Sequence, residues 1–563
     1  MPKRAKKADT ANSVWDSEIR LLAWLAMCAS VLAFLFYYQR SEVLLYGDAI
    51  AHINIARRVF DSKTPGLLQL GTVWLPLPHL LMVPFLISNQ LWRSGAGGSI
   101  PSMVAYVFGV IGIFRLTRRA LSRGISPDGP ARFAGWTAAI IYALNPNLIY
   151  MQSTAMGESL YLAFFIWAVV FFSEWVQGEA KALTKCGLCL ASACLTRYDG
   201  WFVTVAMAGV VFLQLVLIGN RVGKSMSTAG SRAAVIKFVL IAASAPALWL
   251  AYNTIIYRNP LEFENGPYSA KAIERKTQTT GTRGHPGSGN LLLAGTYFVK
   301  SAEANVAQNE WLQRMWILLA VAGIVTCVLT ATLSPALVAG TFVARSLWPL
   351  LFLLIPLPFY ALSIAYGGVP IFIPYWWPFT HYNVRYGLQL LPAFSAAVAL
   401  LVFLIARLQV LKSRVRMVCV VAVFGIVMAS YASIWQVTPI CLREAQVNMR
   451  TRNQLQAQLS VWIEKMSPDS TLLMYLGDHV GALERAGFPL KRTINEGNHR
   501  VWKQPADAAG LWERALANPS QYADYVLAFE GDPVWEAVHG MHLHELVEIH
   551  VTGQARAILY QAR

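Results

Sequence analysis

Two residues suited to acid–base chemistry follow the first long apolar segment. Asp48 and His52 lie four residues apart in YGDAIAHINIARRVFDS, so a helix would place them on neighbouring positions of one side. The apolar residues of this stretch recur at helical spacing and predict an amphipathic helix along a membrane surface. A carboxylate at the hydrocarbon boundary is well placed to act as a general base. The alternative for Asp48 is an N-cap, because Asp is favoured where a helix starts.

Two further charged residues stand at the ends of apolar segments. Glu158 follows ALNPNLIYMQSTAMG, where a helix restarts, and is either a partner of the helix dipole or a functional acid. Arg385 begins an otherwise uncharged apolar segment in PYWWPFTHYNVRYGLQLLPAF. Its guanidinium suits a phosphate, which it can hold with two parallel hydrogen bonds. The alternative for Arg385 is contact with ordinary lipid headgroups.

Aromatic and histidine side chains surround these charged positions. They predict substrate contacts, although interfacial anchoring explains such residues equally well. In LTRYDGW, a local ion pair between Arg197 and Asp199 is a sufficient explanation. No Cys or His spacing indicates a metal site, so we expect neither metal ligands nor a cofactor, with a divalent ion left open. The additional residues predicted to bind substrate are His52, Trp74, His79, His381, Tyr382 and Tyr386.

The composition requires a membrane around these residues. Of 563 residues, 56% are apolar and 14% charged, and the mean hydropathy is +0.44, which excludes an ordinary soluble protein. The net charge of +17 sits mostly in short loops between apolar segments, so it indicates membrane topology and no nucleic-acid partner. The seven cysteines lie mostly within apolar segments and form no disulfide framework.

We expect about eleven spanning helices. With a cytoplasmic N-terminus, the basic loops then all face inward, as the positive-inside rule requires. The apolar stretch 75–92 is excluded from the count because three prolines interrupt it, and we expect it to be juxtamembrane or re-entrant. The expected spans are 21–39, 99–117, 133–150, 158–176, 186–197, 200–218, 236–256, 312–332, 347–366, 384–406 and 417–436.

A tail of different character follows the last span. Its compact apolar runs TLLMYLG, ADYVLAF and HELVEIHV read as strands between helices. The sequence therefore predicts a mainly α protein with two parts: a transmembrane bundle over 1–440, with amphipathic juxtamembrane helices in its first outer loop, and a small extracytoplasmic α/β domain over 441–563.

This arrangement of motifs resembles the GT-C superfamily of integral-membrane glycosyltransferases. The likeness rests on an acid directly after the first helix, an outward Glu after a Pro-containing helix, an outer Arg-Tyr pair and an external C-terminal domain. It is greatest to the branch with dolichyl-phosphate-mannose protein mannosyltransferases and lipid A aminoarabinose transferases. The resemblance implies that Asp48 is the first-loop catalytic acid, Glu158 a second outer acid and Arg385 the group on the lipid phosphate. The mannosyltransferases typically have Asp-Glu where this chain has Asp48-Ala49.

The function expected from this resemblance is sugar transfer from a polyprenyl-phosphate-linked donor to an acceptor hydroxyl, with inversion and with Asp48 as general base. The acceptor, whether lipid, glycan or protein, would be met on the extracytoplasmic side of a bacterial inner membrane. Two alternatives stay open: a ligase or polymerase using lipid-diphosphate-linked glycans, and a transporter or flippase for lipid-linked saccharides. A transporter should carry polar groups along a mid-membrane path, and few are found.

Overall fold

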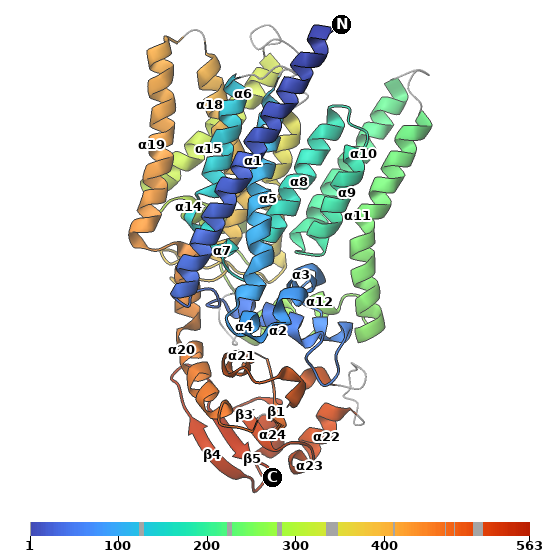
Figure 1. The fold of residues 1–563 in the computed structure, drawn as a ribbon, viewed down its shortest axis with the longest axis vertical. Coiled ribbons are helices and arrows are strands. Elements are labelled where there is room, and N and C mark those ends of the chain that lie inside the picture. Colours follow the sequence, from blue (N-terminus) through green and yellow to red (C-terminus); the bar gives the residue numbers. More distant parts are fainter. Residues whose placement is uncertain are drawn as a thin grey trace.

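The chain folds as a bundle of long helices with a small β-sheet at one end (Figure 1). The computed structural model describes residues 2–122, 129–221, 228–277, 284–333, 347–408, 411–467, 469–477, 479–498 and 510–563. The end of the bundle that carries the sheet is called the sheet end below. The predicted fold class, a mainly α membrane bundle with a small sheet domain, is confirmed.

The bundle helices present apolar side chains outward, which identifies an integral membrane protein. Seven described helices are long and apolar enough to cross a membrane. Trp24 and Leu32 on α1 and Leu240 and Leu248 on α11 are each more than 60% exposed, a pattern that only hydrocarbon surroundings favour. The helices that coincide with the expected spans are α1 (Pro2–Gln39), α5 (Ala96–Leu121), α6 (Gly129–Ala143), α8 (Glu158–Val176), α9 (Ala182–Cys194), α10 (Asp199–Arg221), α11 (Thr228–Tyr257), α15 (Glu310–Leu333), α17 (Pro356–Tyr366), α18 (Leu391–Arg407) and α19 (Ser413–Val437).

Each expected span coincides with one of these helices, with differences at three places. The span expected at 133–150 is interrupted, because Asn145 caps a new helix, α7 (Pro146–Gln152), with Pro146 in its first turn. The spans expected at 347–366 and 384–406 begin with 3₁₀ turns, η2 (Trp348–Leu354) and η3 (Val384–Leu390). The total of eleven spans stays a prediction.

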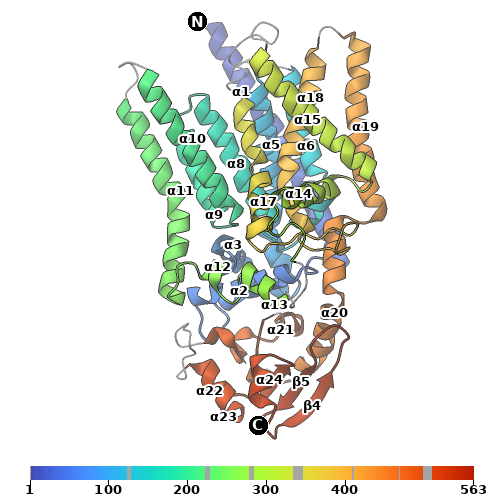
Figure 2. The same cartoon turned by 180° about the vertical axis from the view of Figure 1, so that it is seen from behind.

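The described helix ends that flank the basic loops lie at the end of the bundle opposite the sheet. The first helix also begins there, as the two opposite views show (Figures 1 and 2). Buried acids neutralise part of this charge: Glu18 pairs with Arg118 and Arg132, and Glu174 pairs with Arg115 at 2.6 Å and Arg119 at 3.0 Å. Loop residues 123–128 and 222–227 lie outside the described part of the chain.

Short helices pack between the bundle and the sheet. Among them α2 (Gly47–Arg58) carries the candidate acid, and eight of its residues are buried, so protein covers it where we expected it to lie free along a membrane surface. Gly98 of α5 permits this packing, since a Cβ there would meet Ile53 of α2 at 2.4 Å. The stretch 75–92 forms α3 and most of α4, and each of these helices is too short to span. The other short elements are η1 (Leu67–Leu70), α3 (Pro76–Leu86), α4 (Asn89–Arg93), α12 (Glu262–Asn265), α13 (Ala270–Thr277) and α14 (Leu291–Val306).

The tail forms a five-stranded sheet in the order β2-β1-β3-β5-β4. β1 pairs in parallel with β2 and β3, and β5 pairs antiparallel with β3 and β4. The three apolar runs identified in the sequence form β1, β3 and β4. The tail elements are α20 (Ile440–Ile463), β1 (Leu472–Met474), α21 (Gly481–Ala486), η4 (Leu490–Arg492), β2 (Thr493–Ile494), η5 (Glu496–Asn498), α22 (Leu511–Ala517), α23 (Pro519–Tyr522), β3 (Tyr525–Phe529), α24 (Pro533–Val538), β4 (His544–Ile549) and β5 (Ala557–Gln561).

Hydrogen bonds fasten the tail to the first loop after α1. Gln69 donates to the Gly497 carbonyl at 3.0 Å, and Asn498 donates to the Thr64 hydroxyl at 2.9 Å. Asp61 accepts from the Lys491 amide at 3.1 Å. The tail therefore covers the short helices at the sheet end.

Glu484 makes the stability of the tail depend on pH. Its side chain is buried in α21, and burial raises its pKa to about 8, against the favourable charges of Arg485 and Arg93. Between pH 4.5 and 8 the folded chain holds a proton that the unfolded chain has released, so stability falls as pH rises, by about 1.4 kcal/mol for each pH unit in this window.

Glu484→Gln is therefore expected to remove this pH dependence. The thermal unfolding midpoint of the detergent-solubilised variant should exceed that of the wild type by a margin that widens from pH 5 to pH 8. The exposed control Glu545→Gln should track the wild type. A margin for Glu484→Gln that stays constant over this range would contradict the proposed protonation.

Candidate functional site

One guanidinium at the sheet end forms ion pairs with three carboxylates. Arg385 donates to Asp48 at 2.6 Å, to Glu444 at 2.8 Å and to Glu158 at 3.2 Å. Glu158, Glu444 and Arg385 are buried, whereas the Asp48 side chain is 38% exposed. Asp48, Glu158 and Arg385 were each singled out from the sequence, and the structure brings all three into one contact group.

Two of the three acids, Asp48 and Glu158, are positioned by the first turns of helices. Asp48 lies in the first turn of α2 and Glu158 in the first turn of α8, where a negative charge is favoured. Tyr46, and not Asp48, occupies the N-cap position of α2, and it makes no side-chain capping bond. The Asp48 carboxylate therefore points to Arg385, and the N-cap alternative is wrong.

A second arginine extends the cluster. Arg197 donates to Glu158 at 3.2 Å, to Asp199 at 3.4 Å and to the Tyr360 hydroxyl at 2.9 Å. Tyr360 in turn donates to Asp199 at 2.6 Å. The local ion pair expected between Arg197 and Asp199 exists, but it is only one part of a network that reaches Arg385 through the shared carboxylate of Glu158.

Tyrosine rings separate and support the two guanidinium groups. The Tyr386 ring lies 5.1 Å from Arg385 and 4.8 Å from Arg197, so it contacts both cations. Tyr46 stacks on Arg385 at 5.0 Å and donates its hydroxyl to the Cys441 carbonyl. Together these contacts leave the Arg385 side chain little freedom to move.

The backbone around Arg385 is held equally firmly. The amide of Val384 donates to Glu444 at 2.6 Å, and its carbonyl accepts from Asn305 at 2.7 Å. The Asn305 carbonyl also accepts from Asn145 and Asn147, which ties α7 and α14 to η3. Close approach of η3 and α14 requires glycine at 387, because a Cβ there would meet backbone atoms of α14 at 2.4 Å.

A pair of histidines lies near Asp48, with His52 on the side of the cluster and His79 behind it. His52 and His79 share a hydrogen bond of 2.8 Å between Nδ1 and Nε2, and both are buried. The Trp74 ring meets His52 edge-on at 5.2 Å. Burial lowers the pKa of both imidazoles, most strongly that of His79. The predicted residues His52, His79 and Trp74 therefore form one contact group.

His381 and Tyr382 lie at the edge of the site. A short bridge joins Tyr382 to Phe372, and the Tyr382 side chain is 41% exposed. His381 accepts from Asn448 through its backbone carbonyl, and burial together with the charge of Arg443 lowers its pKa. Neither residue contacts Arg385 among the bonds described.

Glu444 and Arg197 are the site residues that sequence reasoning missed. Glu444 stands on α20 beside the buried residues Cys441 and Ala445, and an acid on the buried stripe of a helix was the available signal. It was missed because the domain boundary expected at 440 placed it outside the bundle.

The cluster can supply a base and a fixed positive charge. If all its groups are ionised, the four acids Asp48, Glu158, Asp199 and Glu444 outnumber the two arginines, and Asp48 is the acid best exposed to a reactant. In the part of the chain that the structure describes, no group of three or more His, Cys, Asp or Glu side chains has the geometry to hold a metal.

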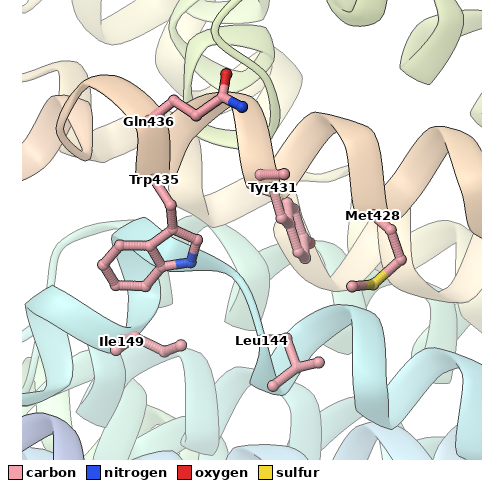
Figure 3. A pocket seen from close by; sticks show the side chains of 7 residues that line it. Leu144, Ile149, Met428, Tyr431, Trp435 and Gln436 are labelled. Atoms are coloured by element: carbon pink, nitrogen blue, oxygen red, sulfur yellow. The ribbon is translucent and has the colours of Figure 1, made fainter.

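An apolar pocket of about 520 Å³ lies away from these charges, between α19 and the α6–α7 turn. In Figure 3, Trp435, Tyr431 and Met428 point from α19 toward Leu144 and Ile149. The lining contains no acid or basic side chain, so acid–base chemistry belongs to the cluster and not to this pocket.

Comparison with family models and with curated proteins gives no match. Among solved structures, the chain is similar to ArnT from Cupriavidus metallidurans bound to undecaprenyl phosphate, at 13% identity and a TM-score of 0.49 over 95% of this chain and 98% of that one. It is also similar to the Archaeoglobus fulgidus oligosaccharyltransferase in its apo form, at 12% identity and a TM-score of 0.46 over 91% and 69% of the two chains. At 12–13% identity these are likenesses of fold.

Proposed function

We propose that this chain is a membrane glycosyltransferase that moves a sugar from a polyprenyl-phosphate-linked donor to an acceptor hydroxyl, with inversion at the anomeric carbon. The observation that carries the proposal is the 2.6 Å contact of Asp48 with Arg385 at the sheet end of a lipid-embedded bundle. A carboxylate to accept a proton and a guanidinium to receive a phosphate thereby stand in one site.

In the proposed reaction, the donor phosphate replaces Asp48 on the Arg385 guanidinium. Asp48 is the partner able to leave, because its side chain is 38% exposed, whereas Glu158 and Glu444 are sealed at 1% and 0%. The released Asp48 carboxylate takes the proton of the acceptor hydroxyl while the hydroxyl oxygen attacks the anomeric carbon of the donor sugar. The bond between that carbon and the phosphate oxygen breaks, and Arg385 stabilises the departing phosphate.

The same proposal places the reaction on the extracytoplasmic side. The described basic residues at the helix ends, among them Arg118, Arg119 and Arg132, lie at the opposite end of the bundle, which the positive-inside rule assigns to the cytoplasm. Nucleotide sugars are cytoplasmic, so a lipid-linked donor suits a site at the sheet end.

The test supplies the full-length protein in lipid nanodiscs with a panel of tritiated sugars on polyprenyl monophosphate. Membranes from a strain deleted for this chain supply the acceptors. We expect tritium to move from one of these donors into a product that organic extraction separates from the donor. A parallel reaction contains a tritiated oligosaccharide on polyprenyl diphosphate: transfer from this donor alone would instead identify a ligase, and tritium that stays on every donor would refute the transferase.

A further inference from the structure

His52 offers one free ring nitrogen to the candidate site. Its Nδ1 shares a hydrogen bond with His79. Its Nε2 has no hydrogen-bond partner in the described parts of the chain, and it is not among the fully buried polar atoms that lack one. His52 lies one helical turn after Asp48 on α2, and the charged groups that act on it are Asp48, Glu158, Arg385 and Arg197, so it lies beside the acid–arginine cluster.

His79 stands behind His52, away from the cluster. It is fully buried, the charged or titratable groups that act on it are His52 and Arg58, and its Nδ1 has no hydrogen-bond partner in the described parts of the chain. With this arrangement His79 cannot touch a reactant, but through its Nε2 it decides which nitrogen of His52 carries the proton.

Both rings are neutral near pH 7, because burial lowers their pKa values. A neutral imidazole N–H can donate one hydrogen bond to a hydroxyl and brings no positive charge to a phosphate. If His79 donates from Nε2 to His52 Nδ1, the Nε2–H of His52 is the donor that remains for a reactant. The remaining Nδ1 of His79 is then an acceptor without a donor, as found among the described residues.

The surroundings of this donor suit a sugar ring. Trp74, half-buried, meets the His52 ring at 5.2 Å and supplies an aromatic surface beside the polar atom. Asp48 lies one helical turn before His52, roughly 5–6 Å away between Cβ atoms. A hydroxyl next to the reacting one on a sugar ring falls within reach of His52 while the reacting hydroxyl meets Asp48.

We propose that the acceptor is a sugar, bound by His52 through a hydroxyl adjacent to the reacting one and by Trp74 through its ring, with His79 as the positioning residue of His52. This assignment of the acceptor rests on the proposed transferase function. A serine or threonine side chain has no second hydroxyl to occupy His52.

Two substitutions at His52 separate this role from a purely structural one. Asn places its amide where Nδ1 lies, so His52→Asn keeps the bond to His79 and removes the group that faces the site. Gln reaches the position of Nε2, so His52→Gln keeps the group in the site and gives up the bond to His79. If His52 has only a structural role, His52→Asn should keep more activity than His52→Gln. If His52 binds the sugar, His52→Asn should keep less activity than His52→Gln.

We expect His52→Asn to raise the apparent acceptor KM, measured by titrating deletion-strain membranes, at least about tenfold, as for a lost substrate hydrogen bond. The donor KM and the unfolding midpoint should stay close to wild type. His52→Gln should lose less, and His79→Gln, which retains an Nε2 donor, should lose less than His79→Leu. The exposed tail substitution His544→Asn is the control. Activity that follows the opposite order, with Asn above Gln at position 52, would overturn the proposal.

A second readout needs no turnover. Diethyl pyrocarbonate modifies accessible neutral imidazoles, and mass spectrometry of the wild-type protein gives the extent of His52 modification. The glycan fraction released from deletion-strain membranes should protect His52, and a pool of Ser/Thr peptides should not. If the glycan fraction protects His52 but no sugar is transferred in the tritium assay, the sugar site would be supported and the proposed reaction refuted. Protection by peptides alone, or by neither pool, would refute the sugar site.

Discussion

Asp48→Asn is expected to lower sugar transfer by roughly a hundredfold to ten-thousandfold while the protein stays folded and binds donor. The loss follows because the amide cannot accept the proton of the acceptor hydroxyl, and a positioned general base contributes an acceleration of this size. The fold should persist, because Asp48 is the most exposed partner of Arg385 and an amide oxygen can still accept its hydrogen bond.

Three measurements check this expectation together: turnover of the tritiated donor, the thermal unfolding midpoint, and retention of labelled donor on the nanodiscs. The matched control is Asp469→Asn, which removes an 88% exposed carboxylate of the tail. Turnover of Asp48→Asn within threefold of that control would show that Asp48 is not the base.

Arg385→Met is expected to destabilise the chain and to abolish transfer. The substitution leaves Glu444 buried without its guanidinium partner and takes one of two arginines from Glu158. Removing one partner of a buried ion pair costs about 3–5 kcal/mol, because the remaining charge has lost its water and its counter-charge. Transfer fails because nothing then holds the leaving phosphate.

A second substitution separates the two effects of losing Arg385. Adding Glu444→Gln to Arg385→Met removes the stranded negative charge, so the unfolding midpoint should recover in part while transfer stays absent. The surface control is Arg40→Met, whose guanidinium is 58% exposed and pairs only loosely with Glu42 at 3.8 Å. If Arg385→Met has the same unfolding midpoint and turnover as this control, Arg385 neither stabilises the buried acids nor holds the leaving phosphate, and both assigned roles are contradicted.

Charges at the ends of apolar segments were the most informative feature of the sequence. Apolar helices rarely carry ionised groups without a reason, so Asp48, Glu158 and Arg385 could be identified from the order of residues alone. The structure adds that the three are joined by hydrogen bonds, which no spacing along the chain could indicate because 227 residues separate Glu158 from Arg385.

The helices were predictable for a related reason. Hydrocarbon forces every backbone group into internal hydrogen bonds, so long apolar runs must be helical. The break before α7 follows from the local chemistry of Asn145 and Pro146, which interrupts the span expected at 133–150. In the tail, β2 has only two residues and carries no pattern long enough to be recognised.

The membership of Arg197 and Glu444 in the site could not be predicted from the sequence. Arg197 has a sufficient local explanation in its ion pair with Asp199, and Glu444 lies beyond the domain boundary that was expected at 440. Their contacts with Glu158 and Arg385 depend on how distant helices meet, and that follows from side-chain packing over the whole bundle.

The most direct test is a cryo-EM structure of full-length Asp48→Asn in nanodiscs with the polyprenyl-phosphate sugar that the wild type uses. The account predicts the donor phosphate within hydrogen-bond distance of the Arg385 guanidinium, with the anomeric carbon turned toward residue 48. Donor density whose phosphate lies elsewhere, with Arg385 still bonded only to its acids, would contradict the account.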